Sequence, residues 1–191
     1  LVVNAETLKI AQIISTGRGP HHVKGFTDWE GNDRMIVEIQ GGGILLLDPN
    51  DDNRVVFAVG TEAPKAESYQ ADVDPAGKNL YINLHLGSRG VAPQLQAAVG
   101  KVDLETGRIT YITGVGHYTN GFAFTSDGKY TYVAESVNSF VYKIDNETDK
   151  VVASSIAGVP GPYMIELNDD ETELWVGGKG EMTFTIGGSL G

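Results

Sequence analysis

The chain has 191 residues, with 25 acidic and 14 basic side chains and a formal net charge of −11. This charge argues against binding to nucleic-acid phosphates or to an anionic membrane surface, and no apolar run approaches the length needed for membrane insertion. The absence of cysteine excludes disulfides, thiolate catalysis, cysteine-ligated iron–sulfur clusters and covalently attached c-type haem within these residues.

The N-terminal segment 1–16 predicts two short strands joined by an acidic turn, and this type of turn recurs along the chain. The four turns read VNAETLKIA (3–11), LDPNDDNRVV (47–56), VDLETGRIT (102–110) and IDNETDKVV (144–152). Each opens on Asn or Asp, at Asn4, Asp48, Asp103 and Asp145, whose side chain can hydrogen-bond the backbone two residues on. These turns predict hairpins between the outer strands of a repeated sheet.

A second recurring turn predicts the hairpin between the inner strands. It reads FTDWEGNDRMIV (26–37), VDPAGKNLYI (73–82), FTSDGKYTYV (124–133) and LNDDETELWV (167–176), and the first copy is enlarged by Trp29-Glu30. Between 116 and 159 both turns separate four short β-branched or aromatic runs, at Phe122–Phe124, Tyr130–Ala134, Phe140–Ile144 and Val151–Ile156. This pattern is typical of a four-stranded antiparallel blade.

The repeats predict an all-β, single-domain β-propeller across residues 1–191. The expected units are 20–61, 63–115, 116–159, and 160–191 completed by 1–17. The last unit lacks outer strands and the N-terminal segment lacks inner ones, so we expect the N-terminal strands to complete the last blade. Two arrangements remain open beside a closed four-bladed ring: two chains paired into eight blades, or part of a larger seven- or eight-bladed ring. The start at Leu1 rather than Met leads us to expect further sequence upstream.

Three stretches, PHHVKGF…MIVE, GKNLYINL and GKYTYVAE…YKIDNETDKVV, resemble bacterial and archaeal YVTN-type β-propeller repeats, which are relatives of the tryptophan–aspartate (WD40-like) repeat. The resemblance covers the whole chain and implies a propeller fold and a periplasmic or extracellular location. The chain departs from the pattern at the enlarged first turn and at HLGSRGVAPQLQAA (85–98), which is an insertion in the second unit.

Residues just before the inner strands and at the ends of the second strands are expected near the channel mouth of a propeller, where convergent polar groups can bind a ligand. The candidates are His21, His22, Glu38, Gln40, Tyr69, Gln70, Asn120, Glu135 and Tyr163. Glu38 and Glu135 occupy equivalent places and could bind a cation together. The inserted loop adds Arg89 and Gln94, because long loops on a rigid scaffold often carry function.

The four histidines, His21, His22, His85 and His117, are candidate metal ligands, with copper or zinc the metals expected from imidazoles without thiolates. Adjacent histidines on an extended strand point to opposite sides. His21 and His22 would therefore need another ligand, from His85, His117 or a carboxylate of another blade. The alternative is that Pro-His-His merely begins an inner strand.

Two functions of different kinds follow. The first is a non-catalytic binding or assembly module that presents one face of the ring to a protein, a glycan or its own copies. It is favoured by the lack of a nucleophile elbow, phosphate loop or dinucleotide fingerprint. The second is a metal- or cofactor-dependent oxidoreductase, as implied by the resemblance to the propellers of amine dehydrogenases, nitrous oxide reductase and nitrite reductase.

Overall fold

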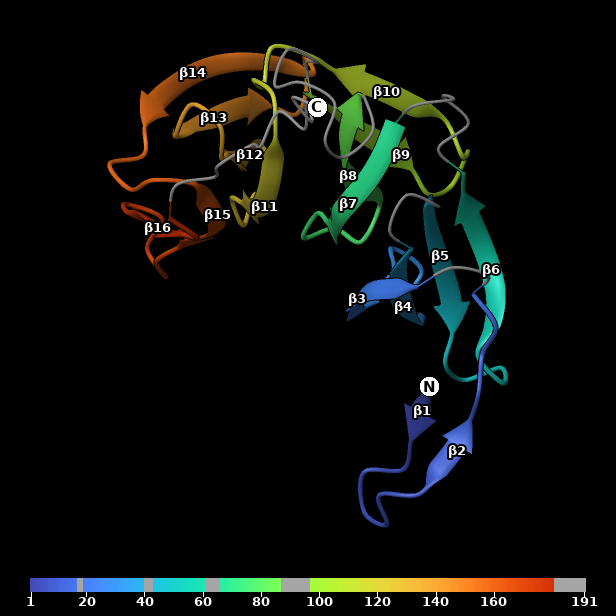
Figure 1. Ribbon diagram of the computed structural model, residues 1–191. Helices are drawn as coiled ribbons and strands as arrows, with labels where there is room; N and C mark the ends of the chain where they lie inside the picture. Colours follow the sequence, from blue (N-terminus) through green and yellow to red (C-terminus); the bar gives the residue numbers. More distant parts are fainter. Residues whose placement is uncertain (17–18, 40–42, 61–65, 87–96, 181–191) are drawn as a thin grey trace, which may run out of the picture.

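The computed structural model describes residues 1–16, 19–39, 43–60, 66–86 and 97–180. Three four-stranded antiparallel sheets follow one another along an open arc, with a two-stranded sheet at each end (Figure 1). Each four-stranded sheet is a meander in which every strand pairs with the next one in the chain. The all-β class and the four-stranded antiparallel blades predicted from the sequence are confirmed. Gln40, Arg89 and Gln94 lie outside the described residues.

The strands of each blade fall between the predicted turns. The first blade contains β3 (Pro20–Thr27), β4 (Asp33–Ile39), β5 (Gly43–Asp48) and β6 (Arg54–Val59). The second contains β7 (Ala66–Val73), β8 (Asn79–Leu86), β9 (Ala97–Asp103) and β10 (Ile109–Ile112). The third contains β11 (Thr119–Phe124), β12 (Tyr130–Glu135), β13 (Phe140–Asp145) and β14 (Lys150–Ile156).

The acidic turns have the local hydrogen bonds expected of them. The side-chain oxygen of each opening residue accepts the backbone N–H two residues on, at 2.9–3.1 Å for Asn4, Asp48, Asp103 and Asp145. Asp145 also accepts the backbone N–H of Thr148, three residues on, and because this bond favours the carboxylate form it lowers the pKa of Asp145. Turn chemistry therefore determines where the outer hairpins begin.

The two ends of the arc are half-blades. β1 (Val2–Val3) pairs with β2 (Ile10–Gln12), and β15 (Pro162–Leu167) pairs with β16 (Leu174–Gly178). The two sheets lie at opposite ends of the arc (Figure 1), so the pairing between them expected from the sequence is not made within the described residues.

The physical reason is the position of the N-terminal hairpin and the curvature of the arc. The Gln12 side chain donates to the Asp52 backbone oxygen at 3.1 Å and accepts from Asn53 at 2.5 Å, so β2 lies against the outer turn of the first blade. That is where the outer half of a preceding blade would lie. The three complete blades do not bend the chain far enough to bring this hairpin to β15 and β16 (Figure 1).

The apolar core lies between neighbouring blades, as shown by the alternation of side chains along β8. Leu80, Ile82 and Leu84 pack in a cluster with side chains of the first blade. Tyr81 packs in a second cluster with side chains of the third blade, including Phe122 and Val133. A smaller cluster joins the third blade to β15 and β16. The second and third blades are thus buried on both faces, which holds the arc together. No described residue belongs to a helix long and apolar enough to cross a membrane.

Tyr81 gives the fold a pH dependence in the alkaline range. Its side chain is fully buried, and this burial raises its pKa above the ordinary value of 10.0. Above about pH 10 the unfolded chain releases the phenol proton while the folded chain retains it, so stability is retained below this pH and lost above it. We expect the free energy of unfolding in urea to fall between about pH 9.5 and about pH 11. The fall should be smaller in Tyr81→Phe, and an equal fall would contradict this explanation.

Candidate functional site

A β-bulge interrupts the inner strand of every blade and of the C-terminal half-blade. In the first blade Pro20 pairs with Ile39 and Val23 with Val37, which leaves His21 and His22 opposite the single residue Glu38. The corresponding positions are Tyr69-Gln70 opposite Asn83, Asn120-Gly121 opposite Ala134, and Tyr163 as one extra residue on β15. A bulge changes the direction of side chains within a strand, and bulges are frequent next to functional sites.

The bulge overturns the prediction that His21 and His22 point to opposite sides. Their ring centroids are 4.0 Å apart and their Nδ1 atoms 3.1 Å apart. The His22 Nδ1 is also 2.6 Å from Glu38 Oε2. The alternation rule for extended chain fails here because two residues occupy the space of one pair in the ladder. His21, His22 and Glu38 therefore face the same space.

Glu38 connects this site to the second blade. Its side chain is buried, and its Oε1 accepts a hydrogen bond from the Ala71 backbone N–H on β7. Burial raises the pKa of this carboxyl, while the Ala71 and His22 hydrogen bonds oppose the rise. One carboxylate oxygen is thus engaged by the neighbouring blade, and the other is directed to the histidines.

Aromatic side chains from the following sheets extend the site around the Tyr69 ring. The rings of His21, His85, Tyr118 and Tyr163 have centroids 5.1–6.2 Å from it. The hydroxyls of Tyr69 and Tyr163 are 3.0 Å apart. We call the set His21, His22, Glu38, Tyr69, His85, Tyr118, Tyr163 and Lys179 the mouth cluster.

A lysine provides a cation at the far side of the mouth cluster. Lys179 Nζ lies 3.2 Å from the centroid of the Tyr163 ring and donates to the Tyr69 hydroxyl at 3.3 Å. Burial, and then the hydrogen bond with Tyr69, raise the pKa of Tyr163 above its ordinary value of 10.0, so this hydroxyl keeps its proton further into the alkaline range. The mouth cluster can therefore donate hydrogen bonds, stack against a flat or C–H face, and attract a negative charge.

The structure places the other predicted residues differently. Asn120 is buried between blades, where its backbone oxygen accepts from the Asn83 side chain at 2.5 Å and its amide donates to Ser136. The Gln70 amide lies 3.5 Å from the Met164 sulfur, beside the mouth cluster. Glu135 accepts the backbone N–H groups of residues 137 and 138 at 2.9 Å, so its carboxylate holds a turn of the third blade and does not meet Glu38.

The histidines divide into two groups. Of the residues that the structure describes, only His21, His22 and Glu38 bring three metal-binding atoms together, all within 4.8 Å of one another. His85 belongs to the mouth cluster, but its Nε2 hydrogen-bonds the Thr119 backbone oxygen at 2.8 Å and its ring stacks on Tyr118 at 3.9 Å. His117 belongs neither to this set of three nor to the mouth cluster. The carboxylate beside His21 and His22 is Glu38, which comes from the same blade and not from another one.

Tyr118 is a member that sequence reasoning missed. The repeats align Asn120 with Tyr69 and Tyr163, but Tyr118, one residue before β11, reaches the His85 ring of the preceding blade. The sequence does contain a tyrosine two residues before Asn120, a predicted mouth position. Only the packing between blades shows that its ring lies against His85.

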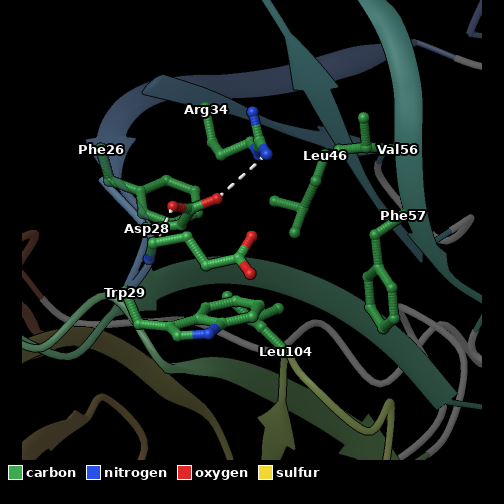
Figure 2. A pocket seen from close by; sticks show the side chains of 9 residues that line it. Phe26, Asp28, Trp29, Arg34, Leu46, Val56, Phe57 and Leu104 are labelled. Atoms are coloured by element: carbon green, nitrogen blue, oxygen red, sulfur yellow. Dashed lines mark hydrogen bonds and ion pairs between the residues drawn. The ribbon is translucent and has the colours of Figure 1, made fainter. Parts of the chain in front are cut away.

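A separate pocket of about 170 Å³ lies between the first and second blades, at the other end of β3 (Figure 2). The Trp29 ring and Leu104 lie on one side and Arg34 on the other (Figure 2). Arg34 pairs with Asp28 at 3.0 Å and Asp48 at 3.1 Å. Burial alone would raise the pKa of Asp28, but hydrogen bonds from Asn32 and the Arg34 charge lower it. The Trp29-Glu30 enlargement noted in the sequence thus contributes to the pocket wall.

The stacked blades and the side chains gathered at their bulges define a β-propeller. The chain belongs to the SMP-30/gluconolactonase/LRE-like family, whose sequence profile matches residues 17–157. The predicted membership in a propeller family is thereby confirmed at the level of the fold, and the YVTN type stays a prediction.

Among solved structures the chain is similar to a Kuenenia stuttgartiensis hydrazine synthase chain (TM-score 0.66, 23% identity, 87% of this chain and 44% of that chain). It is also similar to the β-propeller domain of Cps50 (Swd1) from Myceliophteria thermophila (TM-score 0.61, 16% identity, 81% of this chain and 48% of that chain). The chain therefore spans slightly less than half the length of either structure. No curated protein matches the sequence.

Proposed function

We propose that the chain is a binding module whose mouth cluster takes a small polyhydroxylated acid or its lactone. The observation that carries the proposal is the convergence of side chains from three blades and a half-blade on the Tyr69 ring. Tyrosine rings pack against the C–H face of such a ligand, and the hydroxyls and Lys179 match its polar groups. Membership in a family that includes lactonases supports this ligand class.

The proposal includes association with further propeller strands, outside the cytoplasm. No described strand pairs with the outer edge of β16, and Trp175 and Met164 are exposed on this half-blade. Unpaired strand edges favour addition of further strands. A second copy of the chain or another polypeptide that completes the ring would cover this edge. The native mass in solution checks this, because an isolated chain that stays monomeric contradicts self-association.

A metal-dependent enzyme at the same mouth is the second candidate. The family includes lactonases and other enzymes, and His21, His22 and Glu38 present the kinds of atom that hold catalytic metals. The oxidoreductase suggested by the sequence rests on the histidines alone. Release of acid from gluconolactone and dye-linked oxidation of amines separate the hydrolytic from the redox form. Ligand binding with neither activity supports the non-catalytic module.

Lys179→Met tests the binding site directly. We expect gluconate, followed by isothermal titration calorimetry, to bind the unaltered chain, and its dissociation constant to rise at least about tenfold in the variant because the ammonium is lost. Lys143→Met is the matched control, since Lys143 Nζ lies 3.7 Å from the centroid of the Tyr130 ring, in another lysine–tyrosine pair. Equal weakening in both variants, or no binding of gluconate or its lactone, would contradict the proposal.

A further inference from the structure

The contact between the two histidines and Glu38 is unusual for groups held only by hydrogen bonds. Nδ1 of His22 has the Nδ1 of His21 at 3.1 Å and Oε2 of Glu38 at 2.6 Å. A nitrogen of a neutral imidazole has either one proton or one lone pair. One proton on His22 cannot point at both neighbours, whereas a cation attracts a lone pair from all three atoms at once.

We propose that His21, His22 and Glu38 form a binding site for a divalent transition-metal ion of the zinc type. The donor set is two imidazole nitrogens and one carboxylate oxygen, whose atoms lie within 4.8 Å of one another. Ligands of a four-coordinate zinc ion are about 3.3 Å apart, so shifts on the order of 1 Å or less bring the three atoms to that spacing. This inference deepens the proposed function. It rests on that function only in taking the mouth cluster as the place where a ligand binds.

The surroundings of Glu38 favour a ligand role. The carboxylate is 3% exposed, and a buried carboxylate needs a compensating cation or several donors. Its Oε1 accepts from Ala71 on the next blade, which fixes the orientation of the group. Partners of this kind orient metal ligands in proteins and strengthen binding. Oε2 is then directed to the space shared with the histidines.

The site leaves room for an exogenous molecule. His21 is exposed and the His22 side chain is 39% exposed, so the metal would be accessible from the mouth. Three protein ligands leave one position of a tetrahedral ion open, as in catalytic zinc sites. The Tyr69 ring is 5.1 Å from the His21 ring, so a molecule bound to the open position would lie against the aromatic part of the mouth cluster.

The test is a titration of the chelator-treated 191-residue chain with Zn²⁺, followed by competition with a chromophoric chelator. We expect one ion per chain with a dissociation constant of about 1 μM or tighter. His21→Ala and Glu38→Gln should each raise the dissociation constant at least about tenfold. Glu38→Gln keeps an oxygen that can accept the Ala71 N–H, so this variant preserves the blade contact. His117→Ala is the control histidine and should bind as the unaltered chain does.

A spectroscopic measurement distinguishes the proposed ligands from other surface groups. Cu²⁺ bound at this site should show hyperfine coupling to two imidazole nitrogens in electron paramagnetic resonance, and to one in His21→Ala. Binding that is unchanged in His21→Ala and Glu38→Gln, or the absence of a one-to-one complex, would overturn the inference and leave an ordinary histidine–carboxylate hydrogen bond. Zn²⁺ binding without gluconate binding would overturn the proposed function and leave the metal site standing. Gluconate binding without Zn²⁺ binding would overturn the metal site and leave the proposed function standing.

Discussion

Tyr81→Ala is expected to lower the free energy of unfolding by about 3–5 kcal/mol, which is the range for removing a large buried ring. Tyr81 is fully buried, and its ring centroid lies 5.1 Å from that of Phe124 and 6.2 Å from that of Phe122. The substitution leaves a cavity between the second and third blades, where the core is shared. Urea denaturation at neutral pH measures the change.

The control for this prediction is Tyr111→Ala in the same blade. Tyr111 lies on β10 and is 63% exposed, so its removal should change the free energy of unfolding by no more than about 0.5 kcal/mol. Similar losses in the two variants would show that burial between blades is not the cause.

Gly77→Ala is expected to be the second most damaging change, with a loss of about 2–5 kcal/mol. Gly77 has a φ of +69°, which disfavours any residue with a Cβ by about 1–2 kcal/mol. An added Cβ would also overlap the Thr27 backbone oxygen and approach the Asp28 backbone at 2.9 Å. Because backbone cannot move aside as a side chain can, the overlap adds about 1–3 kcal/mol. Thermal and urea unfolding both measure this loss.

Gly128→Ala separates the two causes. Gly128 occupies the corresponding turn of the third blade with a φ of +70°, and no atom lies within 4 Å of the position that its Cβ would take. We expect this variant to lose only the backbone contribution of about 1–2 kcal/mol. If Gly128→Ala were as unstable as Gly77→Ala, close packing between the first and second blades would not be needed to explain the effect.

The hairpins could be predicted from the sequence because their causes are local. The side chain of Asp145 bonds the backbone of Glu147 and Thr148 within the same turn, and no distant residue is involved. The β-branched and aromatic runs on either side then pair with their neighbours along the chain. Short-range turn chemistry and strand patterning are sufficient for this level of the fold.

The direction of side chains at the mouth could not be predicted in the same way. A bulge is a property of two paired strands, and the sequence of β3 alone does not show that His21 and His22 share one place opposite Glu38. The Tyr118–His85 stack depends on how one blade lies against another. The sequence therefore indicates which residues come near the mouth, and the packing of blades decides which of them meet.

The sequence also does not determine whether the two half-blades meet and close the ring. Residues 1–16 and 160–180 each form a two-stranded half-blade, so the two ends of the chain are complementary in their strands. This complementarity does not determine the curvature of the arc, which depends on the small angle between each pair of packed blades. The half-blades consequently remain apart in this structure (Figure 1).

The divided role of Glu38 links events at the mouth to the joint between two blades. One oxygen of this carboxylate holds the Ala71 amide of the second blade, and the other faces His22 of the first. Anything that immobilises Glu38 from the mouth also restrains the two blades relative to each other. Reciprocity of coupling requires the converse, so that loosening this joint weakens occupancy of the mouth by the same free energy. Substitutions between the blades would then alter affinity without touching the ligand.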